Sequence, residues 1–203
     1  MSSVITSAIP APAEPGSDTA ARILDVAERL VQQRGFNGFS YADVAGQLGV
    51  AKPSLHYHFA GKAQLGEALL ARYTQRFAAA LALIDSSPSG ARTKLQRYTE
   101  LYAQVLDGDR LCLCGMLAAE YETLPERMRE SLLRFFDGNE RWLSRVLHQG
   151  RQAGELRYRG TDAEQARLLL GALEGAMLVA RAYHDPQRLR VSARRLVAAL
   201  AGV

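Results

Sequence analysis

Residues 40–59 contain the spacing that most restricts how this chain can fold. Ala45 is followed by Gly49 four residues later and by Leu55 after six more. An alanine lets two helices cross closely, a glycine adopts the left-handed conformation of a tight turn, and a leucine fills the gap between the helices. This spacing is typical of a helix-turn-helix, in which the second helix reads DNA. An ordinary small helical hairpin has the same kinds of residue, so the spacing alone leaves both interpretations open.

Apolar residues recur every three or four positions through most of the chain, which predicts amphipathic helices. Ser40 with Asp43 and Thr161 with Glu164 have the spacing of capping boxes, and Thr123 is placed to cap the helix that follows it. No strand, hairpin or repeat signal is present. We therefore predict an all-α fold of about nine helices, near residues 18–34, 40–48, 52–59, 62–84, 91–106, 110–122, 124 to 150 or 154, 161–183 and 186–200.

Composition supports a folded globular protein. The 203 residues are 48% hydrophobic and 23% charged, which argues against disorder, collagen-like repeats and a disulfide scaffold. The longest uncharged apolar stretch, residues 111–119, is about half of a bilayer span, and no basic residue precedes Arg22 to form a secretory signal. We therefore expect a cytoplasmic protein with no membrane partner, whose cysteines Cys112 and Cys114 stay reduced. Residues 1–17, rich in Ser, Pro and Ala, are expected to be a mobile tail.

Charge alone does not locate a DNA-binding face. The chain has 25 basic and 21 acidic residues, a formal charge of +4, yet residues 1–62 carry five of each. The distribution of lysine is more informative, because two of only three lysines bracket one short segment, Lys52 to Lys62. We therefore look for function in that segment.

The third predicted helix concentrates side chains that can reach DNA. Leu55 and Phe59, four residues apart, face the core. The remaining side chains offer donors to base edges and phosphates: Lys52, Ser54, His56, Tyr57 and His58.

Two further residues flank this helix at positions suited to phosphate contacts. Ser40, at the start of the second helix, can present backbone N–H groups and a hydroxyl, and Lys62 begins the fourth helix. A metal site at His56 and His58 is disfavoured, because residues two apart do not share a helix face and no third ligand is near. We expect no metal and no other cofactor.

The stretch from Phe39 to Leu65, FSYADVAGQLGVAKPSLHYHFAGKAQL, closely resembles the signature of TetR-family transcriptional regulators. The likeness includes the Gly-Phe pair before the second helix, the Leu-x-x-x-Phe core of the third and the lysine that starts the fourth. With the first helix it covers residues 18–66. The family usually has a tyrosine where this chain has His56, and often another at His58.

The resemblance implies a helix-turn-helix DNA-binding domain over residues 18–61 and a ligand-binding and dimerisation domain over residues 62–203. In the family, the last two helices form a four-helix bundle with those of a second subunit. The resemblance and the side chains of the third helix together give the candidate DNA contacts, which are Ser40, Tyr41, Lys52, Pro53, Ser54, His56, Tyr57, His58 and Lys62.

The C-terminal half carries aromatic, sulfur and carboxylate groups in largely apolar helices. Most such residues form the core of a helical protein, but a few polar groups in an apolar cavity can orient a small ligand. The candidate effector-binding residues are Tyr98, Tyr102, Cys112, Met116, Glu120, Tyr121, Phe135, Trp142 and Met177.

Cys112 has a second interpretation. The run from Cys112 to Glu120 resembles a Cys-x-x-Gly-x-x-Ala-x-Glu element of part of the TetR family, some members of which sense electrophiles or oxidants with a cysteine. A thiol near a helix N-terminus is more reactive, and Arg110 adds positive charge. The alternative, a small buried side chain, is favoured because free cysteines are among the most buried residues.

Gly171 and Gly175 lie four residues apart in the eighth predicted helix, beside Ala172 and Ala176. Glycine in a helix costs about 1 kcal/mol relative to alanine, so two of them suggest close packing as compensation. A dimer interface would supply it, and packing within the same chain is the alternative. The candidate interface residues are Gly171, Gly175, Leu178, Leu189 and Leu196.

These observations predict a homodimeric, ligand-responsive transcriptional regulator, most simply a repressor, that leaves a near-palindromic DNA operator when a small molecule binds. The helix over residues 62–84 would transmit the change as a lever. A sensor that reacts at Cys112 is one alternative. A small helical enzyme is another, opposed by the lack of a phosphate loop, nucleophile elbow, metal cluster or paired-carboxylate site in the sequence.

Overall fold

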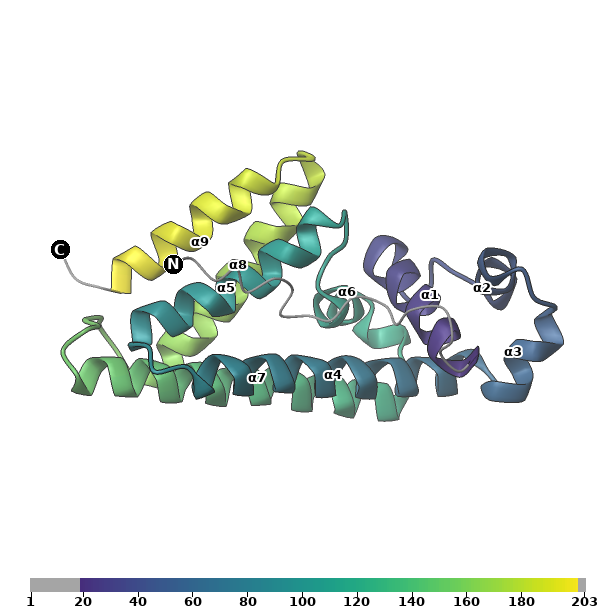
Figure 1. Ribbon diagram of the computed structural model, residues 1–203, viewed down its shortest axis with the longest axis horizontal. Coiled ribbons are helices and arrows are strands. Elements are labelled where there is room, and N and C mark those ends of the chain that lie inside the picture. Colours follow the sequence, from purple (N-terminus) through teal and green to yellow (C-terminus); the bar gives the residue numbers. More distant parts are fainter. Residues whose placement is uncertain (1–18, 201–203) are drawn as a thin grey trace. The chain divides into compact units, whose positions relative to one another are not determined.

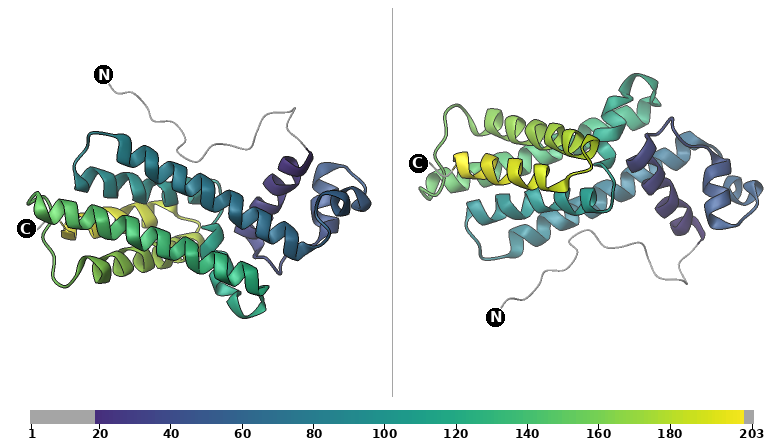
Figure 2. Two further views of the ribbon diagram at one scale, coloured as in Figure 1. Left: turned by 90° about the horizontal axis from the view of Figure 1, so that it is seen from below. Right: turned by 90° about the horizontal axis from the view of Figure 1, so that it is seen from above.

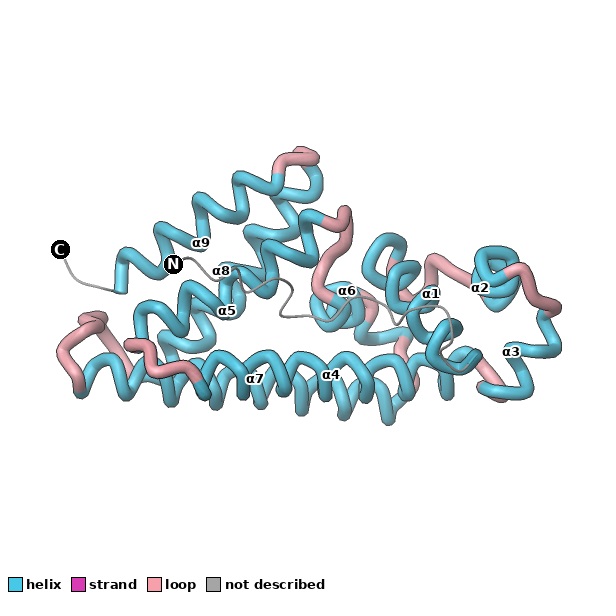
Figure 3. Tube along the Cα trace, in the orientation of Figure 1, coloured by secondary structure: helices cyan, strands magenta, loops and turns pink. Residues whose placement is uncertain are grey.

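The computed structural model describes residues 19–200, so the predicted tail over residues 1–17 lies outside the described residues. Over that range the chain forms nine α-helices and one short 3-10 helix, with no strand, which confirms the all-α prediction (Figure 3). None of these helices is both long and apolar enough to cross a bilayer. The chain divides into two compact units, each described by itself below.

Unit 1 comprises residues 19–77 and Cys112–Arg134. Its first three helices are α1 (Thr19–Arg34), α2 (Tyr41–Leu48) and α3 (Lys52–His58), labelled in Figure 1. Leu55 of α3 is fully buried and Ala45 of α2 is buried, as the helix-turn-helix spacing predicts. Gly49 ends α2 in the left-handed conformation, with a φ of 67°. The turn therefore has the backbone geometry that the glycine made possible.

The α2 helix begins with a complete capping box. The Ser40 side chain accepts the Asp43 N–H, and the Asp43 carboxylate accepts both the Ser40 N–H and the Ser40 hydroxyl. These bonds lower the pKa of Asp43. Because α2 has only eight residues, the cap satisfies N–H groups that a short helix would otherwise leave unpaired.

A buried ion cluster joins α1 to α4 (Lys62–Ser86), whose residues up to Phe77 belong to unit 1. Glu28 of α1 is 6% exposed, and its carboxylate accepts hydrogen bonds from Arg72, at 3.1 Å, and from Arg76. Arg72 also donates to Asp25 at 2.8 Å. Four charged side chains thus contact one another and are largely withdrawn from water, which fixes α1 on α4.

The chain after Cys112 differs from the sequence prediction. Instead of one helix over residues 110–122, the structure has α6 (Leu113–Ala119) followed by the 3-10 helix η1 (Tyr121–Thr123). Glu120 separates them, with a backbone (φ −109°, ψ 17°) outside the α-helical range, and its side chain bonds to another segment. The Thr123 hydroxyl donates to the Glu120 carbonyl and accepts from Asn37, so these bonds take the place of the predicted cap on α7 (Glu126–Gln152).

Unit 2 comprises Ala78–Leu111 and residues 135–203, of which those up to 200 are described. Here α5 (Ala91–Asp107), α8 (Asp162–Ala182) and α9 (Pro186–Leu200) pack on one another (Figure 2). The last residues of α4 and most of α7 complete this unit. Its core is made of leucine and aromatic side chains from these helices, among them Leu95, Tyr98, Leu143, Leu173 and Leu189.

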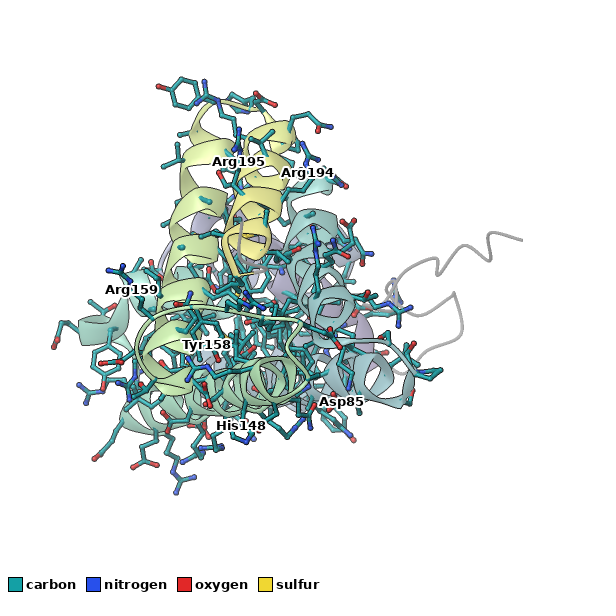
Figure 4. The ribbon with its side chains drawn as sticks, turned by 90° about the vertical axis from the view of Figure 1, so that its left-hand side faces the viewer. Asp85, His148, Tyr158, Arg159, Arg194 and Arg195 are labelled. Atoms are coloured by element: carbon teal, nitrogen blue, oxygen red, sulfur yellow. The ribbon has the colours of Figure 1, made fainter. Side chains whose placement is uncertain are left out.

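Polar contacts fix the corner between α7 and α8. Thr161 and Glu164 form the predicted capping box at the start of α8. Next to it, Asp162 accepts a hydrogen bond from Tyr158 at 2.6 Å and lies 2.9 Å from His148 Nδ1. Tyr158 and His148 are labelled in Figure 4. The hydrogen bond from Tyr158 is the main cause that lowers the pKa of Asp162. The corner is therefore held by side chains from the end of one helix and the start of the next.

A second contact, between Asp107 at the end of α5 and Arg190 of α9, makes stability depend on pH. The two groups form a bidentate pair, with distances of 2.8 and 2.5 Å, and the hydrogen bonds from Arg190 lower the pKa of Asp107. A carboxylate with a lowered pKa stabilises the fold above its unfolded pKa of about 3.9, and this contribution is lost as the pH falls through the lower folded pKa.

We expect Asp107→Asn to lower the free energy of unfolding at about pH 6 by about 0.5 kcal/mol. The effect is small because the side chain of Asp107 is 46% exposed and because a carboxylate at a helix C-terminus is itself unfavourable. Urea titrations of both proteins at about pH 6 and about pH 2 measure the difference. A difference that persisted unchanged at the lower pH would contradict the assignment, because the contribution of the Asp107 carboxylate decreases as the pH falls.

Candidate functional site

The exposed face of α3 carries the side chains that the sequence predicted to meet DNA. Lys52, His56 and Tyr57 are exposed, and Ser54 and His58 are half-buried. Tyr57 has 87% of its surface exposed, and its ring lies edge-on to His58 with centroids 5.1 Å apart. A large aromatic side chain so exposed on a seven-residue helix contributes little to the fold. It is available for contact with another molecule.

His56 stands where the family usually has tyrosine, and its surroundings define its chemistry. Its ring lies on the ring of Tyr41, with centroids 4.8 Å apart, and its Nδ1 is 3.2 Å from the Ala60 carbonyl oxygen. Because a carbonyl only accepts, Nδ1 carries the proton in this contact and Nε2 of the neutral ring is an acceptor. His56 can therefore offer an acceptor where a tyrosine would offer a hydroxyl.

Two of the candidate DNA contacts have internal roles instead. Tyr41 is buried, and its hydroxyl donates to the Phe59 carbonyl at 2.9 Å; burial raises the pKa of this hydroxyl. Lys62 donates from Nζ to the Phe39 carbonyl at 2.5 Å and lies over the Phe39 ring, 4.4 Å from its centroid. We leave Tyr41 out of the candidate interface, and Lys62 serves first to fix the backbone before α2. Pro53 is exposed in the first turn of α3.

The candidate effector residues fall in both units. In unit 1, Cys112 is the N-cap of α6 and is 2% exposed, and the Tyr73 hydroxyl lies 3.7 Å from its Sγ. Cys114 is also buried. Met116 and Tyr121 are half-buried. The thiol of Cys112 thus packs among side chains, as the favoured interpretation of the sequence expects.

Glu120, also in unit 1, departs from the expectation that it orients an effector. Its carboxylate accepts the backbone N–H groups of Phe36 at 2.5 Å and of Asn37 at 3.1 Å. Both acceptor oxygens are therefore engaged by the loop between α1 and α2. The sequence contained no local signal for this contact, because the partners are 84 and 83 residues apart.

In unit 2, the candidate effector residues Tyr98, Tyr102, Phe135, Trp142 and Met177 are all buried. The hydroxyls of Tyr98 and Tyr102 are 3.1 Å apart, and Tyr98 donates to Asn139 at 3.0 Å. The Tyr98 ring is stacked on Trp142 with centroids 5.4 Å apart. Asn139 was missed by sequence reasoning. The sequence feature that points to it is a polar residue on the otherwise apolar inner face of α7, between Phe135 and Trp142.

Trp142 is anchored by Asp85, which lies at the end of α4 in the same unit. Asp85 is labelled in Figure 4. The Trp142 Nε1–H donates to the carboxylate at 3.0 Å, and Arg145 donates to the same oxygen at 2.6 Å. A buried indole N–H needs such an acceptor. The tryptophan that stacks on Tyr98 is therefore fixed in orientation.

The candidate dimer residues lie mostly on an exposed face of α8 and α9. A Cβ added at Gly171 or Gly175 would meet no other atom within 4 Å, so the alternative of packing within the same chain is wrong. Leu178 is exposed on the same face, and Leu196 is half-buried. Leu189 is fully buried in the core of the unit, which removes it from the candidate interface.

This face is apolar and grooved. A groove of about 510 Å³ between α8 and α9 is lined by Gly175, Ala176, Val179 and Val191 together with polar residues of α9. Further exposed apolar side chains lie on the same two helices: Leu168, Leu178, Val179, Tyr183 and Val191. Several exposed apolar side chains on two neighbouring helices favour a site of association. Over residues 19–200, by contrast, no group of His, Cys, Asp and Glu is arranged to hold a metal.

Comparison with known proteins covers both parts of the chain. Residues 23–69 match the family described as bacterial regulatory proteins, tetR family, and residues 91–196 match the tetracyclin repressor-like C-terminal domain. The HTH-type transcriptional repressor NemR of Escherichia coli K12 is 30% identical over 168 residues, which is 81% of this chain and 84% of NemR.

Solved structures extend the similarity to nearly the whole chain. A TetR-family regulator from Agrobacterium tumefaciens has a TM-score of 0.86 at 30% identity, covering 90% of this chain and 97% of that one. The reduced form of Escherichia coli NemR has a TM-score of 0.74 at 29% identity, covering 92% of this chain and all of that chain (100%).

Proposed function

The chain belongs to the tetR family of bacterial regulatory proteins, and from this premise we propose that it is a transcriptional repressor that a small molecule releases from DNA. The observation that carries the DNA-binding part is the exposed polar face of α3, with Tyr57 87% exposed, on a helix whose Leu55 is fully buried. A short helix fixed on one side and polar on the other is what the major groove requires.

We further propose that the protein acts as a homodimer on a near-palindromic operator. One recognition helix of seven residues reads few base pairs, so a second half-site is needed for specificity. We place the two-fold axis of this dimer at the apolar face of α8 and α9, and the two half-sites of such an operator would lie about 34–36 Å apart. Because the proposed target is DNA, we expect the protein in the cytoplasm.

The small-molecule part of the proposal rests on family membership and on aromatic side chains with hydroxyl groups in the C-terminal half. The effector must bind the DNA-free form better than the DNA-bound form, because only differential affinity shifts an equilibrium. A thiol sensor is not favoured, since Cys112 is 2% exposed and contacted by Tyr73. We propose no catalytic activity, because the relatives are transcriptional regulators.

The test is binding to the DNA duplex that the unsubstituted protein selects from a random-sequence pool, called here the selected duplex. We expect Lys52→Ala and Tyr57→Ala to weaken binding at least tenfold, because each removes a group from the α3 face. If Lys52 contacts one phosphate per half-site, its loss lowers the salt slope of a dimer by about 1.8, at about 0.9 per phosphate. Fluorescence anisotropy at several salt concentrations measures both quantities.

Two controls separate DNA contact from folding. Tyr57→Phe keeps the ring and removes only the hydroxyl, so comparison with Tyr57→Ala distinguishes stacking from hydrogen bonding. Circular dichroism reports whether the helices persist. Unchanged affinity for both alanine variants would place the DNA-binding surface elsewhere, and selection of no duplex by the unsubstituted protein would overturn the proposed function.

A further inference from the structure

The loop between α1 and α2 is held by a carboxylate from a distant part of unit 1. Gly35 has a φ of +85°, and the next two backbone N–H groups, of Phe36 and Asn37, both point to the side chain of Glu120. Successive N–H groups next to a left-handed residue form a concave anion site. A Cβ on residue 35 would approach Glu120 Oε1 to 2.8 Å, so the glycine is also what lets the carboxylate come this close.

A second contact supports the first. The Asn37 side-chain amide donates to the Thr123 hydroxyl at 2.7 Å, and that hydroxyl donates to the Glu120 carbonyl at 2.8 Å. Glu120 follows the last residue of α6, and Thr123 ends η1. The end of α6 and the short helix after it are thus joined to the same two residues of the loop.

The other end of the loop leads to α2, the helix that packs on the recognition helix α3. Lys62 donates to the Phe39 carbonyl, and its ammonium lies 5.0 Å from the Phe36 ring and 4.4 Å from the Phe39 ring. Burial lowers the pKa of Lys62, and the negative charge of Glu120 partly opposes this shift by favouring the charged form. Phe39 precedes Ser40, the N-cap of α2. The loop therefore passes from the carboxylate to the cap of the helix that packs on α3.

We propose that Glu120 is a positioning residue that couples α6 to the placement of α2 and α3. This inference rests on the proposed function and deepens it, since it names the contact through which a movement of α6 reaches the DNA-binding helices. When α6 moves, it either carries the loop along or breaks two charge-assisted hydrogen bonds, which are stronger than neutral ones. By linkage, DNA that fixes α2 and α3 also stabilises α6 in its position against the loop.

If Glu120 only stabilised the fold, DNA binding would not affect α6. The test therefore measures the effect of DNA on α6 rather than the free energy of unfolding. Cys112 is a natural reporter, because it is the N-cap of α6 and is 2% exposed. It reacts with iodoacetamide only when this part of α6 opens. In a Cys114→Ala background, the rate of Cys112 alkylation is measured with and without saturating selected duplex.

In the background protein we expect the duplex to slow alkylation at least fivefold, the lower end of typical coupling between sites. Glu120→Gln keeps the shape of the side chain but loses its charge and one acceptor, and we expect the slowing to fall below twofold while the duplex still binds. Glu122→Gln, two residues away on an exposed side chain, is the matched control and should behave like the background.

Each outcome decides the matter. Equal slowing in Glu120→Gln and the background overturns the inference, as does the absence of slowing in the background. If Glu120→Gln does not fold, Thr123→Val replaces it, because this variant removes only the second contact. We expect the duplex to slow Cys112 alkylation in Thr123→Val to an intermediate extent, and slowing equal to that in the background overturns the inference. Failure of the proposed function appears earlier and separately, as selection of no duplex.

Without DNA, hydrogen exchange at the Phe36 and Asn37 amides should be about tenfold faster in Glu120→Gln.

Discussion

Replacing Glu28 by glutamine is expected to lower the free energy of unfolding by about 3 kcal/mol, the low end for removal of one partner of a buried ion pair. Glu28 is 6% exposed and accepts hydrogen bonds from both Arg72 and Arg76. Without the Glu28 charge, Arg76 loses the carboxylate that it contacts and Arg72 keeps only Asp25, although both guanidinium groups are only about one-fifth exposed. We take the low end because this remaining exposure lets water solvate the arginines in part.

The expected loss of unfolding free energy arises mainly because the arginines remain buried without the Glu28 charge, and not from the strength of the ion pair itself. The Nε atoms of Arg72 and Arg76 already have no hydrogen-bond partner, so the guanidinium groups depend on their terminal nitrogens. Replacing Glu28 and Arg76 together by methionine should therefore cost less than Glu28→Gln alone, because no buried charge is orphaned at Arg76 and Arg72 retains Asp25.

Urea denaturation of the unsubstituted protein, of Glu28→Gln and of the double methionine variant measures these losses of unfolding free energy. Glu122→Gln, at an exposed position, is the control that should leave the unfolding free energy unchanged. A loss below about 0.5 kcal/mol for Glu28→Gln would mean that the cluster behaves as an ordinary surface ion pair.

The helices could be predicted from the sequence because their signals are local. Ser40 with Asp43 and Thr161 with Glu164 are three residues apart, and Gly49 ends α2 through its own backbone conformation. Such signals need no knowledge of the rest of the fold. The exposed face of α3 could be predicted for the same reason, since Leu55 and Phe59 fix which side is buried.

The internal roles of Tyr41, Lys62 and Glu120 could not be predicted, because each depends on a partner chosen by tertiary packing. The partners are 18, 23 and 84 residues away, respectively. All three side chains bind backbone groups of loops or helix ends, which carry no residue-specific signal in a sequence. From sequence alone, a polar side chain near a predicted interface therefore cannot be distinguished from one whose partner is the chain itself.

Gly175 offers the sharpest test of the proposed assembly, because its surroundings within one chain are empty. A Cβ at this position meets no atom within 4 Å, so alanine is free of steric conflict in the subunit. By helix propensity alone, Gly175→Ala should stabilise an isolated subunit by about 1 kcal/mol. Any loss of dimer in this variant must then arise from contact with a second copy.

Gly175→Leu should separate the subunits. The position lies on the groove of about 510 Å³ between α8 and α9, next to Val179 and Val191. If two copies pack their helices closely across this face, a leucine on each copy forces the backbones apart at the two-fold axis, where both copies carry the change. Because a lone seven-residue recognition helix reads only one half-site, we expect affinity for the selected duplex to fall at least a hundredfold.

Sedimentation velocity and anisotropy, run on the same samples, distinguish the possible outcomes. Gly138→Leu is the matched control, since a Cβ there meets only Arg141 at 4.0 Å and the position lies on α7 rather than on the proposed interface. We expect Gly138→Leu to remain a dimer and Gly175→Leu to sediment as a monomer with its helices intact. If Gly175→Leu stays dimeric and binds the duplex tightly, the two-fold axis does not pass through α8 and α9, and the exposed apolar side chains of these helices must serve a different partner.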